Sequence, residues 1–224
     1  MSKGKIKASR ELAFVLGMVI MPFAVSLCQK ADLGMSMIAA PTYIISQRVS
    51  FLSYGQAEYI FQAVVLAIMC IIIKKFKLIY LTSFISAVVY GTILDGFIFL
   101  IKADQPAELM WQRIVLFAAG VFLTSLAVSL LMHTYLAPCA YDYLVRMVVE
   151  VRGFDLRKTK LINDFTYLAL GTALTLVLFH GFKGVTLATL VISAVNGNLI
   201  SFLSSGIDKH FEFFDRFPKL ANIF

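Results

Sequence analysis

Two acidic residues lie inside long apolar runs of this sequence, where a charged side chain is costly and usually has a function. Glu58 lies in the first turn of the apolar run 54–73, and Asp164 lies in the first turn of the run 160–179. Lining a polar cavity, the two carboxyl groups could bind a proton or a cation in turn. The alternative is that both are helix-start acids that touch water, a position that the helix dipole favours by about 0.3–1 kcal/mol.

A third acid, Asp95, lies deeper in its own apolar run, between Gly91 and Gly96. The two glycines would allow a neighbouring helix to approach closely around the carboxylate. The alternative is an acid whose side chain extends to the outer interface. Gln62 adds a polar side chain near Glu58, one helical turn further on. We therefore include Asp95 and Gln62 among the residues expected near a substrate or coupling-ion site.

Two further polar positions complete that expected site. Asn196 precedes Gly197 in the last apolar run, where hydrogen bonding between helices is the first expectation and ligand contact the second. Asp32 ends the first run at an Asp-Leu-Gly turn signal and precedes the short apolar segment 35–46. A helix starting there would direct its free N–H groups at a bound ligand.

Two pairs of oppositely charged residues lie four positions apart in the second half of the chain. They are Asp142 with Arg146, and Lys160 with Asp164. This spacing permits ion pairs along one helix face. Such pairs are structural in most helices, or they act as a gate at the membrane edge.

No catalytic constellation is present, so we expect no enzyme activity, no cofactor and no metal site. The sequence contains no nucleophile motif, phosphate-binding loop or dinucleotide fingerprint. The histidines and cysteines lack metal-ligand spacing and are scattered through the chain, at His133, His180, His210, Cys28, Cys70 and Cys139.

The composition is that of a membrane protein throughout. Of the 224 residues 60% are hydrophobic and only 15% are charged, whereas a soluble domain carries about a quarter charged residues. The net charge of +7 comes from short basic clusters between apolar runs, which argues against nucleic-acid binding. We expect a single membrane domain over residues 1–224 that lies in the lipid bilayer.

The apolar runs predict an all-α protein with six transmembrane helices, because each is about 20 residues long. Two shorter apolar segments, 35–46 and 138–151, are too short to span and are expected to form re-entrant or interfacial helices. Residues 206–224 are expected to form a cytoplasmic interfacial tail, in which the aromatic, mixed-charge stretch 211–217 is an interfacial helix on the inner leaflet. The predicted spans are 11–29, 54–73, 78–101, 110–132, 160–179 and 184–204.

The distribution of Lys and Arg predicts that both termini are cytoplasmic. With that orientation 15 of the 20 basic residues lie on the cytoplasmic side and 5 on the outer side. Segment 35–46 then lies at the outer side and segment 138–151 at the inner side.

The two halves of the chain resemble each other, which predicts an internal repeat of 10–101 and 110–205. At an offset of 103, the tetrapeptide AVSL at 24–27 meets AVSL at 127–130. At an offset of 106, Glu58 meets Asp164. With three spans per unit the halves must be oppositely oriented, as in many secondary transporters. The alternative is chance similarity between apolar helices.

Four short segments together resemble the bacterial YczE/YitT-like integral membrane proteins, over nearly the whole chain. They are ADLGMS at 31–36, YGQAE at 54–58, KLIND at 160–164, and the stretch from GVT at 184–186 to Gly197. The usual glycine-threonine pair before the last span is interrupted here by Val185. The resemblance implies a location in the bacterial cytoplasmic membrane and implies little about function, because that family is largely uncharacterised.

The function expected from these features is secondary transport of a small solute, or its binding by a transporter-like protein. A homo-oligomer is compatible with the sequence. Two alternatives remain open at this point. One is a membrane scaffold or regulator, which would have a solid, dry core between the halves. The other is a substrate-capturing subunit of a larger ATP-driven transporter, which would require a separate ATPase.

Overall fold

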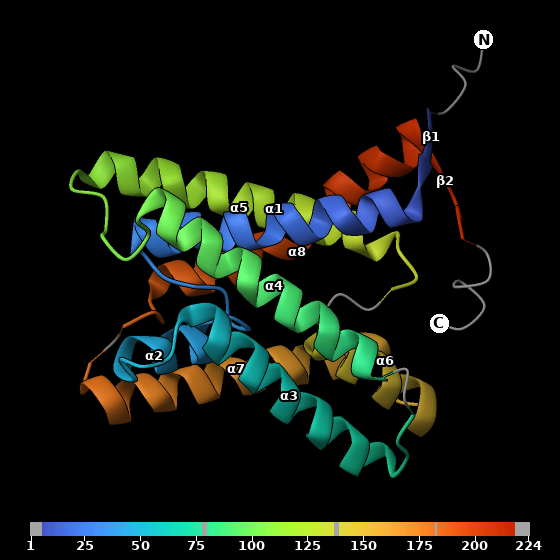
Figure 1. Cartoon of the computed structure of the whole chain (residues 1–224), viewed down its shortest axis with the longest axis horizontal. Helices are drawn as coiled ribbons and strands as arrows, with labels where there is room; N and C mark the ends of the chain where they lie inside the picture. Colours follow the sequence, from blue (N-terminus) through green and yellow to red (C-terminus); the bar gives the residue numbers. More distant parts are fainter. Residues whose placement is uncertain (1–5, 78–79, 137–138, 182, 218–224) are drawn as a thin grey trace.

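The fold is an all-helical bundle with one small pair of strands at its end (Figure 1). The computed structural model describes residues 6–77, 80–136, 139–181 and 183–217. The first residues of the predicted segments 78–101 and 138–151, and the tail residues 218–224, lie outside this description. The elements are β1 (Ile6–Ser9), α1 (Arg10–Ala31), α2 (Ala40–Arg48), α3 (Tyr54–Ile73), α4 (Tyr80–Ile101), α5 (Met110–Met132), α6 (Ala140–Arg152), α7 (Leu156–Phe179), α8 (Leu187–His210) and β2 (Phe211–Phe214).

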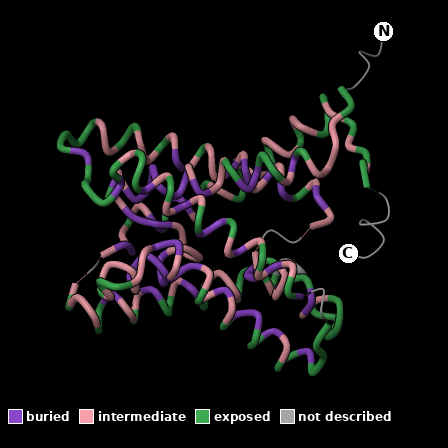
Figure 2. Tube along the Cα trace, in the orientation of Figure 1, coloured by how far each residue is buried: buried purple, intermediate pink, exposed green. Residues whose placement is uncertain are grey.

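Six helices are long and apolar enough to cross a membrane, which indicates a multi-pass membrane protein and confirms the predicted number of spans. They are α1, α3, α4, α5, α7 and α8. Large apolar side chains such as Ile71, Phe99 and Phe202 point outward from these helices. In Figure 2 the buried residues gather where helices face one another. An apolar exterior of this kind suits contact with lipid chains.

Local hydrogen bonds define where the helices begin and end. The Ser53 hydroxyl accepts from the Gln56 N–H and the Gln56 side chain accepts from the Ser53 N–H, which forms a capping box at the start of α3. Thr186 and Thr189 form the same arrangement at the start of α8. Helix α1 ends at Asp32, which adopts the left-handed conformation.

The helices form two groups with α4 between them (Figure 1). Helix α5 packs against α1 and α8, and α1 also packs against α4. In the other group, α3 packs against α2 and α6, and α7 packs against the same two short helices. Helix α4 joins the groups because it contacts both α1 and α3. The two short helices are therefore held between α3 and α7, inside the second group.

The chain termini form a strand pair where an interfacial helix was predicted, so that prediction was wrong for its described part. Helix α8 continues to His210, and Phe211–Phe214 then forms β2, which pairs in parallel with β1. Residues of β2 alternate between half-buried and exposed, the period of a strand. Arg10 reinforces the pair through an ion pair with Asp215 at 3.0 Å.

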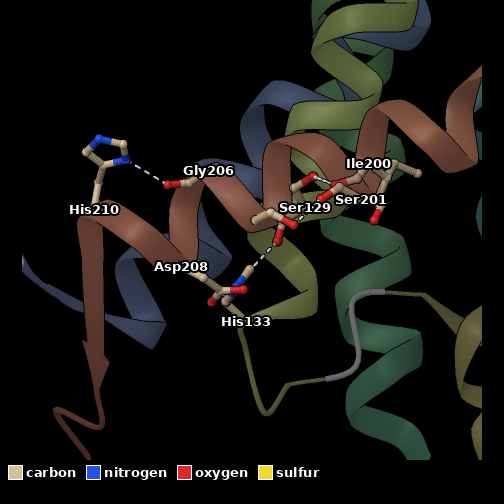
Figure 3. Close-up of polar contacts among 8 residues, drawn as sticks. Ser129, His133, Ile200, Ser201, Gly206, Asp208 and His210 are labelled. Atoms are coloured by element: carbon tan, nitrogen blue, oxygen red, sulfur yellow. Dashed lines mark hydrogen bonds and ion pairs between the residues drawn. The ribbon is translucent and has the colours of Figure 1, made fainter.

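His133 links the ends of α5 and α8 beside this strand pair (Figure 3). Its Nδ1 lies 2.7 Å from the Ser129 carbonyl oxygen and its Nε2 lies 2.9 Å from Asp208 Oδ1. The imidazole ring also packs against Phe213, with ring centroids 4.9 Å apart. One side chain thus connects α5, α8 and β2.

We expect His133→Ala to loosen this end of the bundle. A neutral imidazole has one N–H to donate and both of its neighbours are acceptors, so the side chain contributes one or two hydrogen bonds. Each is worth about 0.5–1.5 kcal/mol, so local opening should increase at least about twofold. Limited trypsin digestion of the purified protein, cutting at Lys209 and Arg216, measures this opening as a faster loss of the tail. His210→Ala is the matched control, because His210 is exposed and bonds only within α8 at Gly206. Equal cleavage rates for the two variants would contradict the expectation.

Candidate functional site

A buried carboxylate, Glu58, is the centre of the candidate site. It lies one turn into α3 and only 5% of its surface is exposed. Three side chains donate hydrogen bonds to it: Tyr141 Oη to Oε1 at 2.8 Å, Gln62 Nε2 to Oε1 at 3.2 Å, and Thr42 Oγ1 to Oε2 at 2.6 Å. Among the ion pairs of the described residues, none involves Glu58. Neutral donors alone therefore solvate this carboxyl group.

The first turns of the two short helices meet at this carboxylate. Thr42 is the third residue of α2 and Tyr141 is the second residue of α6, and these helices come from opposite halves of the chain. The Gln62 side chain also accepts a hydrogen bond from the Ala140 N–H at 2.9 Å. That N–H is one of the unpaired amides at the start of α6, where Cys139 provides no side-chain cap. The positive ends of two helix dipoles are thus directed at one acid.

Aromatic rings enclose the site on its α6 and α7 side. The ring centroids of Tyr141 and Tyr167 are 5.2 Å apart, and both rings contact Phe61. Burial raises the pKa of the Tyr141 phenol well above its usual range, and the Glu58 carboxylate raises it further. Tyr141 therefore remains a hydrogen-bond donor at physiological pH. On the other side, the Tyr54 ring contacts Tyr43 at 5.6 Å.

Asp95, on α4, contacts the start of α3 and does not belong to the cluster around Glu58. Its Oδ1 accepts a hydrogen bond from the Gly55 N–H at 2.8 Å, and its Oδ2 accepts one from the Ser53 hydroxyl. The carboxylate thereby satisfies an amide that the helix start leaves free. Gly91 lies directly against Gly55 in the same contact. The glycines do allow close approach, and Asp95 holds α4 to α3.

Asp32 lies beside a pocket of about 310 Å³ at the end of α1. Its carboxylate is 3.9 Å from the Arg113 guanidinium. Lys183 and the buried Tyr43 line the same pocket, so groups of both charges face it. The complete lining is Cys28, Asp32, Gly34, Met35, Tyr43, Lys183, Gly184 and Thr186. A pocket of this size accommodates a small molecule.

Asp142 and Lys160 form an ion pair between α6 and α7, with Nζ and Oδ1 3.3 Å apart. The pairs that the sequence spacing allowed, Asp142 with Arg146 and Lys160 with Asp164, are not among the ion pairs of the described residues. Arg146 is exposed on α6. Asp164 is half-buried, and its Oδ1 is a buried atom without a hydrogen-bond partner among the described residues.

Glu58 and Asp164 are separated in space by two tyrosines. Tyr141 binds Glu58, its ring contacts Tyr167, and Tyr167 lies one turn after Asp164 on α7. The two acids therefore lie in the same helix group, with Tyr141 and Tyr167 between them.

Asn196 belongs to the contact between α5 and α8. Its side-chain oxygen accepts a hydrogen bond from the Ser125 hydroxyl, and one turn further the Ser129 hydroxyl donates to the Ile200 carbonyl at 3.1 Å. These bonds hold two helices together. Of the residues predicted for the site, the structure brings only Glu58 and Gln62 into direct contact.

Two site residues, Thr42 and Tyr141, were not predicted. Both lie within the two short apolar segments 35–46 and 138–151, and the structure places them in the first turns of α2 and α6. Among the described residues, no group of three or more His, Cys, Asp or Glu side chains could hold a metal ion.

A helical bundle with six membrane-suited helices and a polar cluster buried inside defines a multi-pass membrane protein with an interior polar site. The chain belongs to the family of unknown function DUF6198, whose family model matches residues 8–205. It is also similar to the uncharacterized protein YyaS of Bacillus subtilis (strain 168), with 25% identity over 197 residues that cover 88% of this chain and 92% of YyaS. No solved structure was found to match. The resemblance to YczE/YitT-like proteins is not confirmed by these matches and stays a prediction.

Proposed function

We propose that this protein is a secondary transporter for a small solute in the bacterial cytoplasmic membrane, with both termini in the cytoplasm. The observation that carries the proposal is the buried carboxyl group of Glu58 between the first turns of α2 and α6. Ionisable groups inside a membrane protein typically mark a path for ions or substrates. Helix starts that meet near the middle of the bilayer are a recurring way to build such a site in transporters.

The helix contacts support an arrangement of two inverted repeats, α1–α4 and α5–α8. Helix α2 packs on α7 while α6 packs on α3, which is the exchange of partners that a twofold axis between the halves would produce. The contact of α1 with α4 likewise corresponds to that of α5 with α8. In this arrangement α2 and α6 are re-entrant helices entering from opposite faces. Glu58, one turn from the end of the span α3, then lies where the first turns of the two re-entrant helices meet, between the repeats where inverted-repeat transporters bind their cargo.

Polar features on either side of Glu58 support alternating access. Tyr54 and Tyr43 lead from the site toward the pocket beside Asp32, which the basic-residue distribution places at the outer face. Tyr141 and Tyr167 lead in the other direction, toward the ion pair of Asp142 with Lys160. That pair joins α6 to α7, so breaking it would release the inner short helix. We assign it the role of the inner gate.

The test is transport by the purified protein in proteoliposomes. On a solid-supported membrane, wild type is expected to produce a current when exposed to defined mixtures of amino acids, small carboxylic acids, amines or monosaccharides. Glu58→Gln should lower that current by about tenfold or more, because a hydrogen bond to a charged group is worth about 1.5–3 kcal/mol. Glu108→Gln is the matched control, since Glu108 is an exposed acid near the start of α5.

A protein-dependent current that Glu58→Gln abolishes and Glu108→Gln preserves supports the proposal. Equal currents from the two variants would remove Glu58 from the transport site. If no mixture produces a current above empty liposomes, transport that moves net charge is excluded for these solute classes, and a membrane scaffold becomes the better explanation for all but electroneutral solutes.

A further inference from the structure

The Thr42 hydroxyl has two acceptors within reach but only one hydrogen to donate. Its Oγ1 lies 2.9 Å from the Ala39 carbonyl oxygen and 2.6 Å from Glu58 Oε2. When Glu58 is ionised, the hydroxyl donates to Oε2. When Glu58 carries a proton on Oε2, the acid can donate to Oγ1 while the hydroxyl turns to donate to Ala39. Both protonation states therefore fit the same heavy-atom positions.

The other carboxyl oxygen is an acceptor in both states. Oε1 accepts from the Tyr141 phenol and from the Gln62 amide. The orientation of the Gln62 amide is determined by its own oxygen, which accepts from the Ala140 N–H at 2.9 Å. The Gln62 amide nitrogen can only donate, and among the hydrogen bonds of the described residues the Tyr141 hydroxyl has no second acceptor to turn to, whereas Thr42 has one. A proton added to Glu58 therefore goes to Oε2. The hydrogen bond between Thr42 and Oε2 is therefore the one that changes direction when Glu58 gains a proton.

The surroundings suit a proton and do not suit a metal cation. Hard cations need several oxygen ligands, and transporters that bind sodium supply backbone carbonyls and helix carboxyl ends. Glu58 instead faces donor groups and the amino ends of α2 and α6. A cation at Oε1 or Oε2 would have to displace a donor from each oxygen and would meet the positive ends of two helix dipoles.

The other ionisable groups around Glu58 are phenols and one thiol. They come from α3, α4, the start of α6, and α7, and they are Tyr54, Tyr90, Cys139, Tyr141 and Tyr167. Phenols and thiols titrate near pH 10 and 8.5 in water. Glu58 is therefore the group in this cluster that changes charge in the neutral and acid range.

We infer that Glu58 and Thr42 form a proton-binding site, with the proton as the coupling ion of the proposed transporter. The coupling role rests on the proposed function, whereas the proton-binding site itself rests on the hydrogen-bond geometry. Proton uptake transfers one H⁺ from water to Oε2 and reverses the Thr42 hydrogen bond, without oxidation or any covalent change. Thr42 is a positioning residue for that proton.

Infrared difference spectroscopy of the protein in liposomes tests the site without any solute. The chain contains 13 acidic residues that protonate over a step from alkaline to acid pH, so the Glu58 signal is the difference between the wild-type and Glu58→Gln spectra. That difference should contain one carboxyl C=O band and the loss of one carboxylate band. Thr42→Val keeps the shape but removes the acceptor of the acid O–H, so this C=O band should move to higher frequency. Thr42→Ser should restore the wild-type frequency. The same spectra recorded with added Na⁺ at constant pH should show no change.

Three outcomes would overturn the inference: no difference between the wild-type and Glu58→Gln spectra, a frequency unaffected by Thr42→Val, or a carboxylate change driven by Na⁺. These results are separable from failure of the proposed function. A titrating Glu58 in a protein that moves no solute would leave the proton site intact and remove transport. Solute currents that do not depend on a pH gradient, in a protein whose Glu58 shows no spectral change, would leave transport intact and remove the proton site.

Discussion

Gly55→Ala is expected to disrupt the packing of α3 against α4. A Cβ atom added at Gly55 would lie 2.0 Å from the Gly91 carbonyl oxygen and 2.7 Å from Asp95 Cγ. The first of these neighbours is backbone, so no rotamer change can relieve the overlap. The helices must separate, which also strains the hydrogen bonds that Asp95 makes at the start of α3. Overpacking of this kind costs about 1–3 kcal/mol or more, and we expect a value at or above the upper end.

The measurement is thermal unfolding in detergent, followed as the loss of the monodisperse peak in size-exclusion chromatography. Gly96→Ala is the matched control because it lies on α4, where an added Cβ meets nothing within 4 Å. In a helix interior alanine is favoured over glycine by about 0.5–1 kcal/mol, so this variant should be unchanged or slightly more stable. Similar unfolding temperatures for the two variants would mean that α3 and α4 do not touch at these glycines.

The sequence predicts those parts of the fold that depend on local properties. A run of about 20 apolar residues indicates a span because of the bilayer thickness, and all six such runs are helical. The start of α3 agrees with the predicted 54, where Ser53 caps the helix, but α7 begins at Leu156 after the cap Asp155, before the predicted 160, because polar residues extend the helix beyond the apolar run. The short segments 35–46 and 138–151 are also helical over most of their length, as α2 and α6.

Contacts between distant segments could not be predicted from the sequence. Pairing of Phe211–Phe214 with Ile6–Ser9 joins the two ends of the chain, and neither segment alone identifies its partner. For the same reason the spacing of Lys160 suggested Asp164 as its partner, although Asp142 on another helix is the one that pairs. Buried acids could be recognised because they are rare in apolar runs. Neutral donors such as Thr42 and Tyr141 are common there and carry no such signal.

Glu58→Ala is expected to destabilise the protein strongly, whereas Glu58→Gln should be tolerated. Alanine removes the acceptor of three hydrogen bonds. The Thr42 hydroxyl can still donate to the Ala39 carbonyl, but the donors of Gln62 and Tyr141 are left buried without a partner. In membrane proteins each hydrogen bond between helices contributes about 0.6 kcal/mol on average and at most about 1.7. Together with the space that the side chain vacates, the loss should be about 2–4 kcal/mol. Glutamine keeps the volume and one acceptor oxygen.

Unfolding in mixed micelles with increasing sodium dodecyl sulfate measures this difference as a change in the free energy of unfolding. Glu108→Ala, at an exposed acid, is the matched control and should leave that free energy within about 0.5 kcal/mol of wild type. Tyr141→Phe removes one donor and should cost about 0.5–1.5 kcal/mol. If Glu58→Ala were as stable as Glu58→Gln, water would have to satisfy the donors of Gln62 and Tyr141 and the site would be open.

A double-mutant cycle separates the hydrogen bond from the packing of the same residues. In a Glu58→Gln background the Tyr141 phenol faces a neutral amide, so Tyr141→Phe should cost less there than in wild type, by about 0.5–1 kcal/mol. The difference reports the interaction of the phenol with the carboxyl group itself. Because Tyr141 belongs to α6 and Glu58 to α3, that interaction joins two helices that are distant in the sequence. A coupling energy of zero would mean that the first turn of α6 is positioned by ring packing against Phe61 and Tyr167 rather than by the acid.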